Sequence, residues 1–145
     1  MIVRKANVKD LNYCVEEGCK FLKTRWPNKK IDKANVYIKL YYLIHSGILL
    51  VADDKGELKG MIGGLVTINI WYGDEIDATE LFWWVPEEHR NSRAGVLLLK
   101  GFIGAAKEKK ATTIVLSLLT KSPISDNALI KRGFKLEEKA FIMEV

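Results

Sequence analysis

The sequence contains few of the residues that build disulfides or metal sites. Only two cysteines and two histidines occur in 145 residues. Cys14 and Cys19 are five positions apart within a helical pattern, which separates them around the helix, so we interpret both as buried thiols. No group of Cys and His has the spacing of a zinc site. We therefore expect neither a disulfide nor a metal.

Long hydrophobic runs are also missing. No apolar run approaches the roughly 18 residues of a membrane span, the first ten residues lack the apolar core of a signal peptide, and no lipidation motif is present. Apolar residues make up 48% of the chain and charged residues 28%, which excludes a disordered protein. We expect one soluble, cytoplasmic domain over residues 1–145. The net charge of +5 permits anionic ligands but selects none.

Strands and helices alternate along the chain in the way of an α/β protein with a mixed sheet. Asn7, Asp32 and Ser125 are expected helix caps, and the glycines at 60, 63 and 64 indicate a bulge or a close backbone approach. The predicted order is β-α-α-β-β-β-α-β-α-β-β, with strands at 2–4, 48–53, 58–72, 78–85, 113–119, 134–138 and 140–145 and helices at 8–25, 33–46, 95–110 and 126–132.

The stretch 80–110 combines a strand, a basic turn and a helix, and we take it as the organising unit of the chain. The strand should end at Pro86, which cannot donate to a sheet ladder. The helix should begin near Arg93 to Val96, so that its free N–H groups and positive dipole end face the carboxyl end of the strand. With Arg90 and Arg93 in the same turn, this arrangement predicts a phosphate site.

The turn resembles the R/Q-x-x-G-x-G/A loop of the GNAT superfamily of N-acetyltransferases. It reads Arg90, Asn91, Ser92, Arg93, Ala94, Gly95. Its first and last positions match, while Arg93 replaces the usual small residue, as in the short phage and prophage members. The order of elements resembles the family from end to end, and the Gly-Phe at 133–134 is similar to the end of the family's last helix.

The resemblance implies that acetyl-CoA is the acetyl donor and that an amine is the acceptor. Pantetheine would follow the strand and the pyrophosphate would occupy the turn. The implied cofactor-binding residues are Phe82, Trp83, Trp84, Val85, Arg90, Asn91, Ser92, Arg93, Ala94, Gly95, Val96 and Ser122. The family's tyrosine before the Gly-Phe is absent, so Ser122, Ser125 or water would protonate the departing sulfur, or the thiolate would leave unassisted.

An acceptor amine is mostly protonated at pH 7, and direct attack on acetyl-CoA in a ternary complex therefore needs a base. Glu80 is the best candidate because it lies mid-strand, where burial would raise its pKa. The alternative is a hydrogen-bonded structural carboxylate. Asp77, Glu87 and Glu88 lie off the strand centre, and His89 is a weaker second choice.

A basic patch joins the first two helices and comprises Lys20, Lys23, Arg25, Trp26, Lys29, Lys30 and Lys33. It leaves two interpretations open. A basic rim there would favour an acidic acceptor, or it is only a solvated turn.

The rival function is a catalytically weak or inactive protein of this fold that binds nucleic acid or a protein partner. One aromatic residue in the patch, without interleaved stacking residues, disfavours nucleic acid. The oligomeric state is not readable, and a homodimer is one option.

Overall fold

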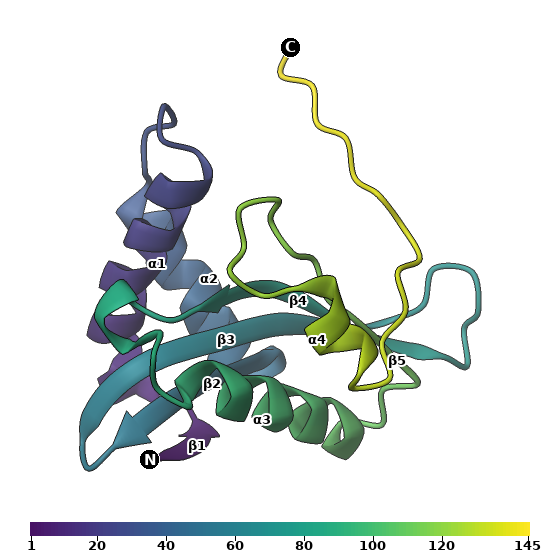
Figure 1. Ribbon diagram of the computed structural model, residues 1–145, viewed down its shortest axis with the longest axis horizontal. Helices are drawn as coiled ribbons and strands as arrows, with labels where there is room; N and C mark the ends of the chain where they lie inside the picture. Colours follow the sequence, from purple (N-terminus) through teal and green to yellow (C-terminus); the bar gives the residue numbers. More distant parts are fainter.

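The chain folds into a five-stranded mixed sheet with helices on both faces (Figure 1). The computed structural model describes residues 1–145. The strand order is β1-β2-β3-β4-β5, with antiparallel neighbours from β1 to β4 and a parallel pair β4/β5. The elements are β1 (Ile2–Lys5), η1 (Val8–Asp10), α1 (Leu11–Arg25), α2 (Lys33–Ser46), β2 (Ile48–Asp54), β3 (Glu57–Ile68), β4 (Ile76–Trp84), η2 (Glu87–His89), α3 (Ala94–Glu108), β5 (Thr113–Val115) and α4 (Asp126–Ile130). The predicted α/β class with a mixed sheet is confirmed.

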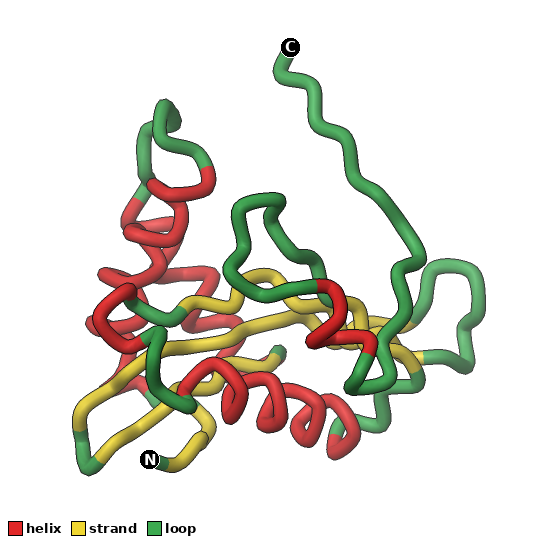
Figure 2. The backbone as a smooth tube through the Cα atoms, in the orientation of Figure 1, coloured by secondary structure: helices red, strands yellow, loops and turns green.

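Two apolar cores lie on opposite faces of this sheet, and β2 contributes to both. Its Ile48, Leu50 and Ala52 pack against α3, while the alternate residues Leu49 and Val51 pack against α1 and α2. This division follows from the period of two along a strand. Figure 2 shows the same layers, with α1 and α2 on one side of the strands and α3 on the other. The sheet is therefore fixed from both faces.

The helix caps predicted from the sequence are present. Asn7 accepts a hydrogen bond from the Lys9 amide at 2.9 Å, and its own amide donates to Asp10 at 2.8 Å, which forms a capping box before α1. Asp32 accepts from the Asn35 amide at 3.0 Å at the start of α2. Ser125 caps α4 in the same way.

Two predicted strands are too long, and side-chain hydrogen bonds explain why. β3 ends at Ile68 rather than at residue 72, because the Asn69 side chain accepts from the amides of Trp71 and Tyr72 and turns the chain. β5 ends at Val115 rather than at residue 119. There the Ser117 amide donates to the Glu80 carboxylate instead of continuing a ladder.

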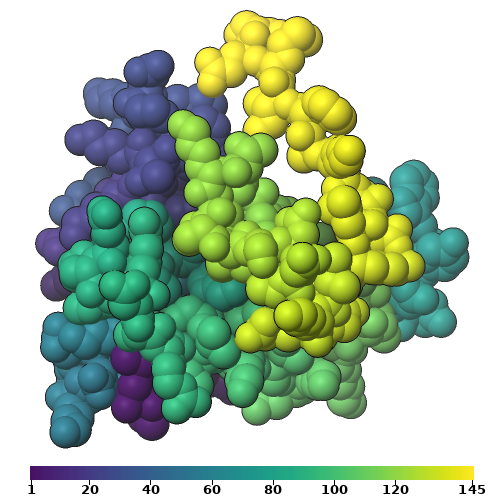
Figure 3. All heavy atoms as spheres, viewed as in Figure 1, coloured from purple at the N-terminus to yellow at the C-terminus, as the bar shows by residue number.

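The predicted closing hairpin at 134–138 and 140–145 is wrong. Residues 134–145 form no strand, and the last part of the chain extends away from the body of the molecule (Figure 3). The hairpin would have to turn at Glu138-Lys139, where the two predicted strands meet, and this is not a pair that favours the positive φ angles of a two-residue hairpin. Strand-like alternation in this segment was therefore not enough to form a hairpin.

None of the helices combines the length and apolar character needed to cross a membrane.

Candidate functional site

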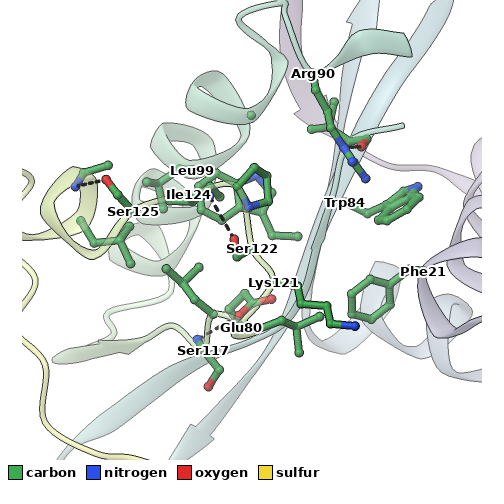
Figure 4. A pocket seen from close by; sticks show the side chains of 18 of the residues that line it. Phe21, Glu80, Trp84, Arg90, Leu99, Ser117, Lys121, Ser122, Ile124 and Ser125 are labelled. Atoms are coloured by element: carbon green, nitrogen blue, oxygen red, sulfur yellow. Dashed lines mark hydrogen bonds between the residues drawn. The ribbon is translucent and has the colours of Figure 1, made fainter. Parts of the chain in front are cut away.

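A cleft of about 850 Å³ opens where the sheet splays between β4 and β5. Its walls come from the end of α1, the second half of β4, the start of α3, residues 117–125 and α4 (Figure 4). Because β4 and β5 are parallel, their carboxyl ends meet at this edge of the sheet, which is where ligands of such sheets bind. This volume is in the range of pockets that bind small molecules.

A bulge at Leu81 shapes the floor of the cleft. Gly64 pairs with Glu80 and Gly63 pairs with Phe82, so Leu81 has no partner in β3. The extra residue reverses which face the following side chains take. As a result Trp83 and Val85 pack toward α3, whereas Phe82 and Trp84 pack toward α1. The predicted irregularity near Gly63 and Gly64 is present, with the extra residue on β4.

Glu80 lies just before this bulge and is the only carboxylate among the residues that line the cleft. It is 8% exposed, and its Oε2 atom accepts a hydrogen bond from the Ser117 amide at 3.2 Å. Burial raises the pKa of Glu80 to about 7, against the smaller opposing effects of the Ser117 hydrogen bond and the Arg25 charge. A carboxyl group with this pKa can accept a proton near neutral pH.

The start of α3 presents unpaired backbone donors to the same cleft. The Gly95 and Val96 amides precede the first intrahelical hydrogen bonds and have no acceptor in the chain, while the Leu97 amide already donates to Arg93. A Cβ atom at Gly95 would lie 3.9 Å from Trp83 and Val85, so the backbone there is open to close approach. This end of the helix suits a phosphate group.

Arg90 stands beside this helix end. Its Nε atom donates to the Val85 carbonyl oxygen at 3.1 Å, and its guanidinium group lies 5.3 Å from the centre of the Trp84 ring. Figure 4 shows Arg90 and Trp84 together on one wall. The remaining N–H groups of Arg90 stay free for an anionic ligand.

Trp84 is itself fixed by a contact from α1. The buried Glu17 carboxylate accepts from Trp84 Nε1 at 2.8 Å and from Lys20 Nζ at 2.5 Å. Phe21 packs edge-on against Trp84 with ring centres 6.0 Å apart. The wall of the cleft next to α1 is therefore aromatic and held in place by contacts from that helix.

Nine of the predicted site residues line the cleft and four do not. Phe82 lies over Gly63 and packs near Phe21, because the bulge turns it to the α1 face. Ala94, the first residue of α3, is fully buried in the core between α3 and the sheet, and Asn91 and Arg93 are exposed. The nine are Glu80, Trp83, Trp84, Val85, Arg90, Ser92, Gly95, Val96 and Ser122.

The sequence prediction missed several lining residues, of which Phe21, Lys121 and Arg132 matter most. Phe21 belongs to the apolar pattern of α1, where a core residue and a site residue look alike. Lys121 follows the parallel strand β5, and its position after a strand end was the one available signal. Figure 4 shows its side chain reaching across the cleft toward Phe21.

The lining is strongly cationic, with Arg25, Arg90, Lys121 and Arg132 against the single carboxylate Glu80. No tyrosine, cysteine or histidine lines it. Ser122 Oγ accepts from the Ile124 amide at 3.2 Å and keeps its own proton to donate. No group of three or more His, Cys, Asp or Glu side chains is placed to hold a metal ion.

The acetyltransferase (GNAT) family matches residues 12–134 of the sequence. The chain belongs to this family. Family membership makes acetyl transfer the general chemistry and acetyl-CoA the general donor. The free helix end and the cationic lining fit the phosphates of that donor. No curated protein matches the chain.

Solved structures share the fold over nearly the whole chain. A transcriptional regulator from Bacillus halodurans is 22% identical with a TM-score of 0.78, covering 99% of this chain and 98% of the other. A predicted acetyltransferase with acetyl-CoA from Clostridium acetobutylicum is 14% identical with a TM-score of 0.77, covering 98% and 94%. An aminoglycoside 6′-N-acetyltransferase from Acinetobacter haemolyticus is 17% identical with a TM-score of 0.74, covering 100% and 98%.

Proposed function

We propose that this GNAT protein transfers the acetyl group of acetyl-CoA to a primary amine by direct attack in a ternary complex. The observation that carries the proposal is the position of Glu80, which lines the same cleft as the unpaired Gly95 and Val96 amides. One end of the cleft can hold phosphate and the other can accept a proton. Acetyl-CoA would supply the acetyl group already activated as a thioester.

The residues of the chain divide the remaining work. The Gly95 and Val96 amides and Arg90 would bind the pyrophosphate, and the β4 backbone around Trp83 to Val85 would bind the pantetheine. Glu80 would take the proton from the amine nitrogen as that nitrogen bonds to the acetyl carbon and the carbon–sulfur bond breaks. The Ser122 or Ser125 hydroxyl group, or water, would return a proton to sulfur. A thiol pKa near roughly 8.5 also permits departure as the thiolate.

Replacement of Glu80 by glutamine tests this assignment. Glu80→Gln keeps the shape of the side chain and should lower turnover by about 10² to 10⁴-fold, with CoA affinity retained. Wild-type activity should fall as the pH drops through about 7, where Glu80 becomes protonated. The variant should recover rate only at alkaline pH, where the free amine is abundant. The measurement is CoA release with a panel of amines at several pH values.

Glu108→Gln is the control, since Glu108 is exposed at the far end of α3. It should keep wild-type turnover. Full activity of Glu80→Gln at neutral pH would make Glu80 a structural carboxylate, and the acceptor would then arrive deprotonated or use His89.

We further propose an acceptor that carries negative charge near its amine. Arg25 lines the cleft and stacks on Trp26 with 4.4 Å between its guanidinium carbon and the ring centre, and Lys29 lies 5.4 Å from the same ring. Lys121 also lines the cleft, together with Arg90 and Arg132. Such a field attracts an anionic acceptor. The cytoplasmic location expected from the sequence, the homodimer that the sequence left as one option, and the likeness to short phage members stay predictions.

A second candidate function is binding of nucleic acid without catalysis. The stack of Arg25 and Lys29 on Trp26 favours it, and the Bacillus halodurans protein of similar fold is described as a transcriptional regulator. Against it, Trp26 is the single aromatic residue of that patch. A duplex that stabilises the protein when acetyl-CoA does not would favour this candidate.

A further inference from the structure

Glu17 is a buried carboxylate outside the cleft. It lies in α1 and is 6% exposed, yet it does not line the cleft. Burial of an ionised carboxylate costs free energy unless donors replace the lost water. Of the other buried acidic residues, Asp10 pairs with Arg4 and closes the capping box before α1, and Glu80 faces the cleft. An apolar residue would pack at position 17 at lower cost, which indicates that the hydrogen bonds of Glu17 have a function.

These hydrogen bonds link α1 to the end of β4. The Oε1 atom of Glu17 accepts from Lys20 Nζ at 2.5 Å within the same helix, and Lys20 is exposed. The Oε2 atom accepts from Trp84 Nε1 at 2.8 Å, although the two residues are 67 positions apart in the sequence. The indole nitrogen can only donate, so a fixed acceptor in this direction defines the orientation of the ring. Glu17 therefore holds Trp84 in one orientation at the wall of the cleft.

Trp84 in turn contacts the arginine that stands next to the free end of α3. The Arg90 guanidinium carbon lies 5.3 Å from the centre of the Trp84 ring, and Figure 4 shows Trp84 between Arg90 and Phe21. Arg90 is exposed and forms no ion pair, so the ring and the Val85 carbonyl oxygen restrain its guanidinium group. A carboxylate that accepts from the indole also polarises the ring, which makes it a better partner for a cation.

We propose that Glu17 is a positioning residue for the binding of acetyl-CoA. It holds Trp84 so that the ring keeps the Arg90 guanidinium group beside the unpaired Gly95 and Val96 amides before the ligand arrives. A long side chain that is already ordered loses less conformational entropy when it binds an anion. This inference rests on the proposed function, because it takes the start of α3 as the site of the pyrophosphate. Glu17 itself contacts no substrate and acts through Trp84 and Arg90.

The first test is calorimetric titration of CoA into the full chain and its variants. Glu17→Leu fills the apolar site but removes the acceptor, and it should raise the dissociation constant of CoA by about fivefold to tenfold. Glu17→Gln keeps an oxygen that accepts from Trp84 Nε1, so its dissociation constant should stay within about twofold of wild type. Glu16→Leu is the control, since Glu16 is an exposed neighbour in α1 that does not line the cleft, and it should bind CoA as wild type does.

A double-mutant cycle with Arg90 separates positioning from a general loss of structure. Arg90→Gln should weaken CoA binding, and the addition of Glu17→Leu to Arg90→Gln should weaken it no further, because the side chain on which Glu17 acts is gone. A structural role of Glu17 would weaken CoA binding by the same factor in both backgrounds. Trp84→Phe keeps an aromatic ring without an N–H group, and it should weaken CoA binding as Glu17→Leu does. This variant supplies the same measurement if Glu17→Leu does not fold.

The indole proton of Trp84 reports the contact with Glu17 directly. The chain has four tryptophans, and the indole signal that is missing from the NMR spectrum of Trp84→Phe identifies Trp84. Its exchange with solvent should be slow in wild type and Glu17→Gln and faster in Glu17→Leu. Equal exchange in all three proteins would overturn the proposal.

The outcomes of the titrations distinguish this inference from the proposed function. Wild type that binds no CoA overturns both. Wild type that binds CoA, with equal affinity in folded Glu17→Leu and Trp84→Phe, overturns only the role of Glu17. The same holds if Glu17→Leu weakens CoA binding by an equal factor with and without Arg90→Gln.

Discussion

Glu80 shows how one buried side chain couples chemistry to stability. Its carboxylate receives a single hydrogen bond, from Ser117, and no ion pair, so little compensates for its removal from water. The desolvation that raises the pKa of Glu80 to about 7 also makes its ionised form costly to the fold. The catalytic role that we propose for Glu80 and the stability of the fold therefore make opposite demands on this residue.

The effect of Glu80 on the free energy of unfolding should change with pH in a defined direction. The pKa of Glu80 is about 7 in the folded chain and 4.5 for a free glutamate, so stability contributed by the protonated form is complete below pH 4.5 and lost as the pH rises through 7. The free energy of unfolding of Glu80→Gln minus that of wild type should therefore rise by about 3 kcal/mol between pH 4 and pH 8. Urea denaturation of both proteins at the two pH values measures it. A constant difference would mean that Glu80 is ordinarily solvated.

At the scale of elements, the basic side chains of the turn between α1 and α2 support the proposal of an acidic acceptor. If this turn steers an acidic acceptor, Lys29→Glu/Lys30→Glu should lower kcat/KM for that acceptor by about tenfold or more at low salt. High salt should remove most of the difference, because the residues act at a distance. Initial rates over a range of salt concentrations test this.

Lys107→Glu/Lys109→Glu makes the same change in net charge near the end of α3, away from the cleft, and should leave the kinetics unchanged. Equal kinetics of wild type and Lys29→Glu/Lys30→Glu at both low and high salt would reduce the basic turn to a solvated surface.

Local signals in the sequence were enough to predict most elements. Caps such as Asn7 and Asp32 depend on hydrogen bonds two or three residues away, and the α3 pattern depends on spacing within one helix. The Leu81 bulge could not be located this way, because its position is a property of the β3/β4 register. The bulge turns the Phe82 side chain toward α1, away from the cleft, although the resemblance to the family had implied that Phe82 belongs to the site. The early end of β5 likewise depends on Glu80, 37 residues from Ser117.

The closing hairpin failed for a related reason. Residues 134–145 alternate as strands do, but a strand must pair with a neighbouring strand. The alternation of apolar residues does not specify which strand that would be. In a single chain the segment finds neither a turn nor a neighbour. Strand-like alternation at the end of a chain therefore does not by itself predict a hairpin when no turn residues accompany it.

At the scale of the whole molecule, one cleft brings together, from five separate parts of the chain, the residues to which we assign roles in acetyl transfer. α1 supplies the aromatic wall with Phe21, β4 supplies Glu80, α3 supplies open amides, and residues 117–125 with α4 supply hydroxyl groups and cations. We propose that acetyl-CoA binds there with its pyrophosphate at the start of α3.

Thermal melts of the full chain with acetyl-CoA test that claim most directly, with a short DNA duplex as the rival ligand. At about 100 times its dissociation constant, acetyl-CoA adds about 2.7 kcal/mol and should raise the midpoint by several degrees, whereas the duplex should not. Gly95→Glu, which places bulk and negative charge at the helix start, should abolish the shift. Gly104→Glu, on the open surface of the same helix, should preserve it. An equal shift in a folded Gly95→Glu variant, or a shift with the duplex alone, would contradict the account.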